Sequence, residues 1–146
     1  MSDATVPRQL AGSCLCGAVR YAVADAFEYA ANCHCSNCRR ATGSAFKPFA
    51  GIRVGQLQLT AGADSRLLLG DPQGDHDTRC RQCGSLLYSI VRDGAFAHVA
   101  MGTLIDAPTI RPTEHIFVGS KAPWHEITDG LPQYAEWAVG EPLNGS

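Results

Sequence analysis

The chain has 146 residues, of which 45% are hydrophobic and 18% charged, and its formal net charge is −2. This composition indicates one globular domain, expected over residues 1–146 with its core at about residues 10–137. The absence of a basic stripe argues against a nucleic-acid partner, and no run approaches the roughly 18 apolar residues of a membrane span. Because the start of the chain lacks a secretory pattern, we expect a cytoplasmic protein with reduced thiols.

Fifteen glycines and eight prolines spread along the chain favour short elements joined by turns. Alternating apolar residues between these glycines predict a mainly β protein of antiparallel sheets. Ser36 is placed to cap a short helical turn that runs toward Gly43. Pro132 is placed to begin one or two helical turns that reach Trp137. The expected strands lie at residues 18–23, 46–50, 56–60, 66–69, 86–91, 96–101 and 115–118.

The seven cysteines fall into three tight clusters, and none is left over. Thiols two or three residues apart are suited to grip one soft cation, and an odd number argues against complete disulfide pairing. The sequence therefore predicts metal binding. The clusters are Cys14 with Cys16, then Cys33 with Cys35 and Cys38, and finally Cys80 with Cys83.

The first and last clusters share one arrangement, because a glycine, Gly17 or Gly84, follows the second thiol of each. Glycine accepts a positive φ, which lets backbone N–H groups point at sulfur. We therefore expect these two pairs to join in a closed four-thiolate site typical of structural zinc. Such a zinc is worth roughly 10–16 kcal/mol, against about 5–15 kcal/mol for a whole domain. Removing it should unfold the protein.

The middle cluster supplies three thiolates within six residues. With water or substrate in the fourth position, such a site can activate an incoming thiol or polarise a small oxygen ligand. His34, between two of the ligands, is expected to point away from the metal. The middle cluster could instead combine with Cys80 or Cys83, and an iron–sulfur centre would also accept four thiolates. A histidine could also close the site, the candidates being His76, His98, His115 and His125.

These motifs resemble those of the glutathione-dependent formaldehyde-activating enzyme family, also described as centromere protein V-like carbon–sulfur lyases. The likeness begins with Gly-Ser-Cys-Leu-Cys-Gly-Ala-Val-Arg-Tyr at residues 12–21 and covers roughly residues 10–137. Its three cysteine motifs occur in the family's order with the family's flanking residues. The other matching segments lie at residues 33–46, 80–86, 101–106, 115–118 and 121–124.

The resemblance implies a β-tent fold of antiparallel sheets with zinc-binding cysteine knuckles and short helical turns. It implies two zinc ions per chain, one structural and one catalytic, with glutathione as cosubstrate. The family's reaction joins formaldehyde to glutathione and forms S-hydroxymethylglutathione, the reverse of a carbon–sulfur lyase step. By this likeness Cys14, Cys16, Cys80 and Cys83 would hold the structural zinc, and Cys33, Cys35 and Cys38 the catalytic zinc.

Four further residues are candidates for substrate contact. Arg39 and Arg40 follow the middle cluster and could bind a glutathione carboxylate, or could form a solvated helix face. Lys121 and Trp124 lie in a matching motif and could line a cleft, or Trp124 could belong to the core. The expected partner is a small-molecule thiol, and a homodimer is kept as an option. The alternative function is a non-catalytic, zinc-stabilised β-tent binding module.

Overall fold

A computed structural model describes residues 6–145, which form two compact units. The first unit contains the chain up to Glu28 together with Ala50–Ile110, and the second contains Tyr29–Phe49 and the chain from Arg111 onward. Both ends of the single domain expected over residues 1–146 lie outside the described residues, and that domain boundary stays a prediction. Within the described range, no helix is both long and apolar enough to cross a bilayer.

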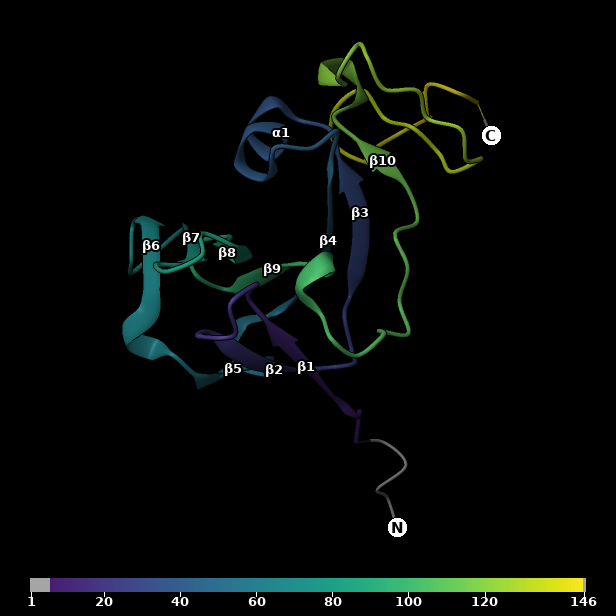
Figure 1. Cartoon of the computed structure of the whole chain (residues 1–146). Helices are drawn as coiled ribbons and strands as arrows, with labels where there is room; N and C mark the ends of the chain where they lie inside the picture. Colours follow the sequence, from purple (N-terminus) through teal and green to yellow (C-terminus); the bar gives the residue numbers. More distant parts are fainter. Residues whose placement is uncertain (1–5, 146) are drawn as a thin grey trace. The chain divides into compact units, whose positions relative to one another are not determined.

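The protein is mainly β with little helix, as predicted (Figure 1). The first unit holds an antiparallel three-stranded sheet in the order β1-β2-β5 and an antiparallel series β6-β7-β8-β9. The strands of the first sheet are β1 (Gln9–Ser13), β2 (Arg20–Ala24) and β5 (Leu57–Ala61). The strands of the series are β6 (Arg66–Gly70), β7 (His76–Cys80), β8 (Leu86–Val91) and β9 (Phe96–Ala100).

Tyr21 belongs to the core of the first unit and is 1% exposed. Its ring meets the ring of Tyr88 edge to face at 5.7 Å, and its hydroxyl lies 2.7 Å from the hydroxyl of Thr103. Gly12 is paired with Tyr21 across the sheet, and a Cβ at Gly12 would lie 2.0 Å from the ring carbon Cζ. Only glycine therefore lets β1 approach this ring.

The second unit contains β3 (Tyr29–Cys33), which pairs in parallel with β10 (His115–Ile116), and the short helix α1 (Ser36–Thr42). The strand β4 (Lys47–Arg53) begins in the second unit and continues into the first. A small core gathers on these strands, and Cys33 is part of it. The buried members of this core are Ala31, Cys33, Phe49 and Ile116.

The structure departs from the expected elements in two ways. It contains β1, β3 and β7, which the sequence pattern did not indicate. The helical turns expected from Pro132 to Trp137 are wrong, because this segment bonds to the β10 region instead of to itself. Tyr134 N–H donates to His115 O at 2.9 Å, for example. Short 3₁₀ turns occur at Val54–Gln56, Ala63–Ser65, Met101–Thr103 and Val118–Ser120.

Candidate metal centres

Four of the seven cysteines come together in the first unit. Cys14 directly follows β1, and Cys80 is the last residue of β7, so each strand delivers one thiol to the same place. Cys16 and Cys83 follow in the turns behind these strands. All four Sγ atoms lie within 4.8 Å of one another. The structure thus brings together the two pairs that the sequence predicted.

The two turns of this centre have matching backbone geometry. Gly17 and Gly84 have φ values of 85° and 81°, in the left-handed region that favours glycine. The N–H of Gly17 donates to Cys14 O at 3.3 Å, and the N–H of Gly84 donates to Cys80 O at 2.8 Å. Backbone N–H groups also point at sulfur, since Val19 N lies 3.2 Å from Cys14 Sγ. Such donors stabilise thiolates and favour metal binding.

The spacing of these sulfurs fits a zinc ion. Cys14 Sγ lies 3.8 Å from Cys16 Sγ, and Cys16 Sγ lies 3.7 Å from Cys80 Sγ. A tetrahedron with zinc–sulfur bonds of about 2.3 Å has edges of about 3.8 Å. The donor set therefore matches four-coordinate zinc in both chemistry and size.

Ser85 links the two turns of the four-cysteine centre. Its hydroxyl accepts a hydrogen bond from Leu15 N–H at 3.0 Å and lies 3.2 Å from Cys83 Sγ. Hydrogen bonding by the Ser85 hydroxyl is the largest cause that lowers the pKa of Cys83 to about 5. At neutral pH, therefore, half-buried Cys83 offers a thiolate to the centre.

The other three cysteines come together in the second unit, where their Sγ atoms lie within 4.8 Å of one another. Cys33 ends β3, and Cys38 lies in the first turn of α1. Cys35, rather than the expected Ser36, caps this helix, and its Sγ accepts a hydrogen bond from Cys38 N–H at 3.2 Å. Sulfur replaces the usual oxygen cap, so helix formation itself holds two of the thiols near each other.

No fourth ligand joins this cluster from the described residues. Between residues 6 and 145, no histidine nitrogen, carboxylate oxygen or further thiol groups with the three sulfurs. Cys80 and Cys83 group with Cys14 and Cys16 instead. His115, a candidate fourth ligand, has its ring nitrogens at hydrogen-bond distance from His34 and Asp129. The described chain thus offers a set of three thiols.

The electrostatics of the three-cysteine centre involve a residue that sequence reasoning missed. The hydrogen bond with Cys38 lowers the pKa of Cys33, while the same bond and burial raise the pKa of Cys38. The charge of Lys47 opposes this rise. Lys47 is only 7% exposed, which is unusual for lysine. No local pattern identifies it, because a lysine at the start of a strand is normally solvated.

The predicted substrate-contact residues have different environments. Arg39 is half-buried and Arg40 is exposed in the last turn of α1, where the helix dipole favours positively charged side chains. Arg39 Nε is buried and without a hydrogen-bond partner. Lys121 donates to carbonyl oxygens of its own loop, at Ala122 and His125, and Trp124 is 70% exposed. Trp124 is therefore not a core residue.

His34 points toward other histidines. It is 0% exposed, and its ring packs 4.9 Å from the ring of Phe46 and 5.0 Å from that of His115. Burial, the largest cause, and the nearby charges of His115, His125 and Lys121 lower the pKa of His34 to about 4. His34 is therefore neutral at physiological pH and does not join the three sulfurs.

A separate groove of about 400 Å³ lies in the first unit. Apolar side chains of β5, β6 and β8 line it together with Arg66 and His76, and none of the seven cysteines contributes. Its walls thus offer one fixed cation and no thiol.

Comparison with known proteins gives a structural relative and a matching family profile. A crystal structure of a Rhodobacter sphaeroides protein, solved as a structural-genomics target, is similar with a TM-score of 0.55 and 28% identity. The similarity covers 68% of this chain and 91% of that protein. No curated protein matches the chain. Residues 9–120 match the profile of the glutathione-dependent formaldehyde-activating enzyme family, and the match includes every cysteine. The chain belongs to the glutathione-dependent formaldehyde-activating enzyme family.

Proposed function

We propose that this protein is a zinc-dependent carbon–sulfur lyase or synthase that acts on glutathione and formaldehyde or a related small electrophile. The observation that carries the proposal is the three-thiol cluster, for which the described chain supplies no fourth ligand. Catalytic zinc sites characteristically keep a position for water or substrate, whereas structural sites are closed. The family, whose description names glutathione and formaldehyde, supplies the substrate class.

Each cysteine cluster has its own role in this proposal. The four-cysteine centre holds a structural zinc, which the distances of 3.7 and 3.8 Å from Cys16 Sγ to two of the other sulfurs support. The three-cysteine centre holds the catalytic zinc, through Cys33, Cys35 and Cys38. A bound zinc ion supplies Lewis acidity, which lowers the pKa of a thiol that reaches its free position.

The protein's own side chains would bind and orient the substrate. Arg39 and Arg40 follow the cluster on α1 and offer guanidinium groups to the carboxylates of glutathione, while Lys47 balances the charge of the thiolates. In the reaction, a carbon–sulfur bond forms between glutathione and the carbonyl carbon. The carbonyl π bond breaks, and the thiol proton ends on its oxygen. Holding both partners makes the addition nearly unimolecular, which is the main source of acceleration.

The test compares the wild type with Cys38→Ser. A free thiol adds to formaldehyde unaided, so the quantity to measure is the acceleration of S-hydroxymethylglutathione formation and breakdown over the uncatalysed exchange, by NMR. We expect Cys38→Ser to abolish the acceleration while the fold, monitored by circular dichroism, is kept. Native mass spectrometry should find two zinc ions in the wild type and one in Cys38→Ser.

A wild type with two zinc ions that neither binds glutathione nor accelerates the exchange would refute the proposed reaction. Loss of folding in Cys38→Ser would instead assign this cluster a structural role. The cytoplasmic location expected from the sequence stays a prediction, and the homodimer stays an option. Size-exclusion chromatography with light scattering measures the second.

A non-catalytic binding module is the second candidate function. The observation in its favour is a set of exposed apolar side chains in the second unit, three of which line one shallow hollow, since contiguous apolar patches often mark interaction surfaces. Trp137→Ser should leave the glutathione reaction unchanged if this surface has no role in it. The side chains are Trp124, Trp137, Val139 and Leu143, with exposures of 70%, 63%, 79% and 62%.

A further inference from the structure

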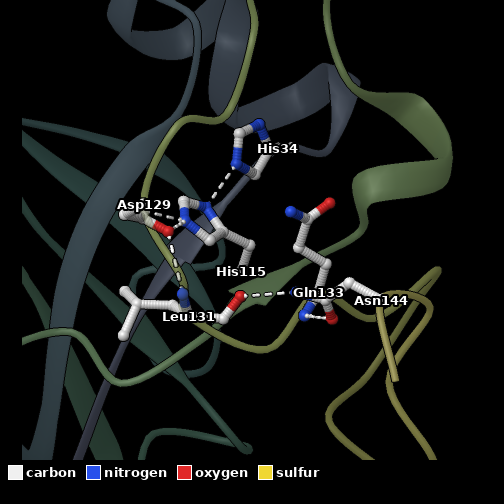
Figure 2. Close-up of polar contacts among 6 residues, drawn as sticks. All are labelled: His34, His115, Asp129, Leu131, Gln133 and Asn144. Atoms are coloured by element: carbon white, nitrogen blue, oxygen red, sulfur yellow. Dashed lines mark hydrogen bonds and ion pairs between the residues drawn. The ribbon is translucent and has the colours of Figure 1, made fainter. Parts of the chain in front are cut away.

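A chain of hydrogen bonds joins Asp129 to two buried histidines of the second unit (Figure 2). His115 Nε2 lies 3.0 Å from each carboxylate oxygen of Asp129, and His115 Nδ1 lies 2.8 Å from His34 Nε2. The side chain of Asp129 is 48% exposed, whereas His34 is fully buried. These hydrogen bonds thus connect the surface of the unit with His34, the residue between Cys33 and Cys35.

The carboxylate at one end sets the position of every proton in this chain. Burial raises the pKa of Asp129, but hydrogen bonds from His115 and Leu131 outweigh it and hold this pKa below its ordinary value. An ionised carboxylate only accepts hydrogen bonds, so a neutral His115 donates from Nε2 and accepts at Nδ1. His34 must then donate from Nε2, and each ring has one allowed tautomer.

The environment of His34, at the buried end of these hydrogen bonds, explains why the direction of donation matters. His34 Nδ1 is buried and has no hydrogen-bond partner in the structure. With the protons placed as above, this atom carries only a lone pair. If the two histidines donated in the opposite direction, an N–H group without a partner would lie there. Buried donors without partners are rarer in proteins than under-satisfied acceptors. Asp129 therefore favours the less costly of the two arrangements.

His34 is held at two points, and both belong to β10 or its side chains. Its backbone N–H donates to Ile116 O at 2.9 Å, and its ring bonds to His115. Neighbouring side chains of an extended chain point to opposite sides. Fixing His34 on one side thus fixes the direction in which Cys33 and Cys35 leave the backbone on the other.

The loop that carries Asp129 is itself held in place (Figure 2). Asp129 Oδ1 accepts a hydrogen bond from Leu131 N–H at 3.1 Å. Asn144 donates to Leu131 O at 3.1 Å and accepts from Gln133 N–H at 3.0 Å. The carboxylate is therefore an anchored group, although its side chain reaches solvent.

We propose that Asp129, acting through His115 and His34, positions Cys33 and Cys35 and so sets the metal affinity of the three-cysteine centre. The inference rests on metal binding at that centre, as proposed above. Replacing a group that is hydrogen-bonded to a metal ligand typically lowers the metal affinity by roughly 10–100-fold. Here the supported residue is the neighbour of two ligands rather than a ligand, so Asp129 is a positioning residue.

The test uses the full chain loaded with cadmium, whose NMR resonances report each thiolate site separately. We compare the wild type with Asp129→Asn, which keeps the size of the side chain but removes its charge. We expect a shifted resonance and a roughly tenfold weaker affinity at the three-cysteine centre alone, measured by chelator competition. The four-cysteine centre serves as the internal control. NMR of the imidazole nitrogens should find His34 and His115 protonated only at Nε2 in the wild type.

Two further variants separate positioning from charge and from folding. Glu126→Gln removes a negative charge from an exposed residue near Asp129 in the chain and should leave both cadmium sites unchanged. Asp129→Glu restores a carboxylate and should recover most of the affinity. The proposal is overturned if Asp129→Asn binds cadmium like the wild type, if both centres weaken equally, or if the cooperative melt is lost. A wild type that binds a single cadmium ion would refute the proposed function together with this inference.

Discussion

The two cysteine centres use the same kind of ligand but draw it from the chain in different ways. The four-cysteine centre joins two distant segments, and the residues Cys16 and Cys80 that meet in it are 64 positions apart. The three-cysteine centre takes all its thiols from six consecutive residues, Cys33 to Cys38. The first therefore links segments that are distant in the sequence, whereas the second is a local cluster of thiols.

This difference predicts separate roles for the two centres, one in stability and the other in chemistry. A metal that closes a long loop restricts the unfolded chain strongly, because loop-closure entropy grows with loop length. A metal held within six residues closes almost no loop and stabilises the fold much less. As proposed above, its three thiols would leave one position of a bound metal for substrate. The four-cysteine centre should therefore govern stability, and the three-cysteine centre should govern chemistry.

The largest expected effect is the loss of the four-cysteine centre. Cys80→Ser removes a ligand that is 1% exposed at the end of β7. Structural zinc is worth roughly 10–16 kcal/mol, which equals or exceeds the stability of a typical domain at about 5–15 kcal/mol. We expect this variant, and the chelated wild type, to lose the far-UV circular dichroism signal and the cooperative melt.

Cys38→Ser is the matched control, because it removes a thiol from the other centre. Its melting transition should stay cooperative and close to that of the wild type. A Cys80→Ser protein that melts like Cys38→Ser would show that the two centres contribute equally to stability, and the proposed separation of roles would fail.

A smaller effect tests how far packing, rather than metal, supports the first unit. Gly12→Ala would place a methyl group 2.0 Å from Cζ of Tyr21, whose ring Tyr88 and Thr103 hold in place. Overpacking of this kind typically costs about 1–3 kcal/mol. We expect urea denaturation of the zinc-loaded protein to show a loss within this range.

Gly55→Ala provides the control, since a Cβ at Gly55 meets nothing within 4 Å. It should change the free energy of unfolding much less than Gly12→Ala. Equal stability of the two variants would mean that the metal alone determines the stability of this unit.

The sequence predicted those features that depend on local spacing. The grouping of Cys14, Cys16, Cys80 and Cys83 followed from two similar motifs, and the positive φ of Gly17 and Gly84 followed from their place after the second thiol. Strands with apolar residues and flanking glycines were also predicted. The strand β7 was missed because its sequence His-Asp-Thr-Arg-Cys is polar, although pairing with β6 and β8 holds it in place.

Long-range polar contacts could not be predicted, because no local pattern encodes them. His34 and His115 are 81 positions apart, and Asp129 lies 14 positions further along the chain. The segment after Pro132 has a plausible helical pattern, but its backbone groups bond to the β10 region instead. Tertiary pairing therefore overrode the local preference in this segment.

The smallest effect concerns the charge beside the three-cysteine centre. Lys47→Met keeps an unbranched apolar stem and removes an ammonium group whose charge favours the thiolate of Cys38. Because three thiolates and one zinc ion leave a net negative charge, we expect metal affinity at this centre to fall about tenfold, or about 1.4 kcal/mol. Chelator competition measures the affinity, and the metal affinity of the four-cysteine centre should not change.

Arg40→Met is the control for charge. It removes an exposed charge from α1 and should change the metal affinity little, since water and salt screen this charge. If Arg40→Met weakened the metal as much as Lys47→Met, net charge rather than a buried cation would tune this centre.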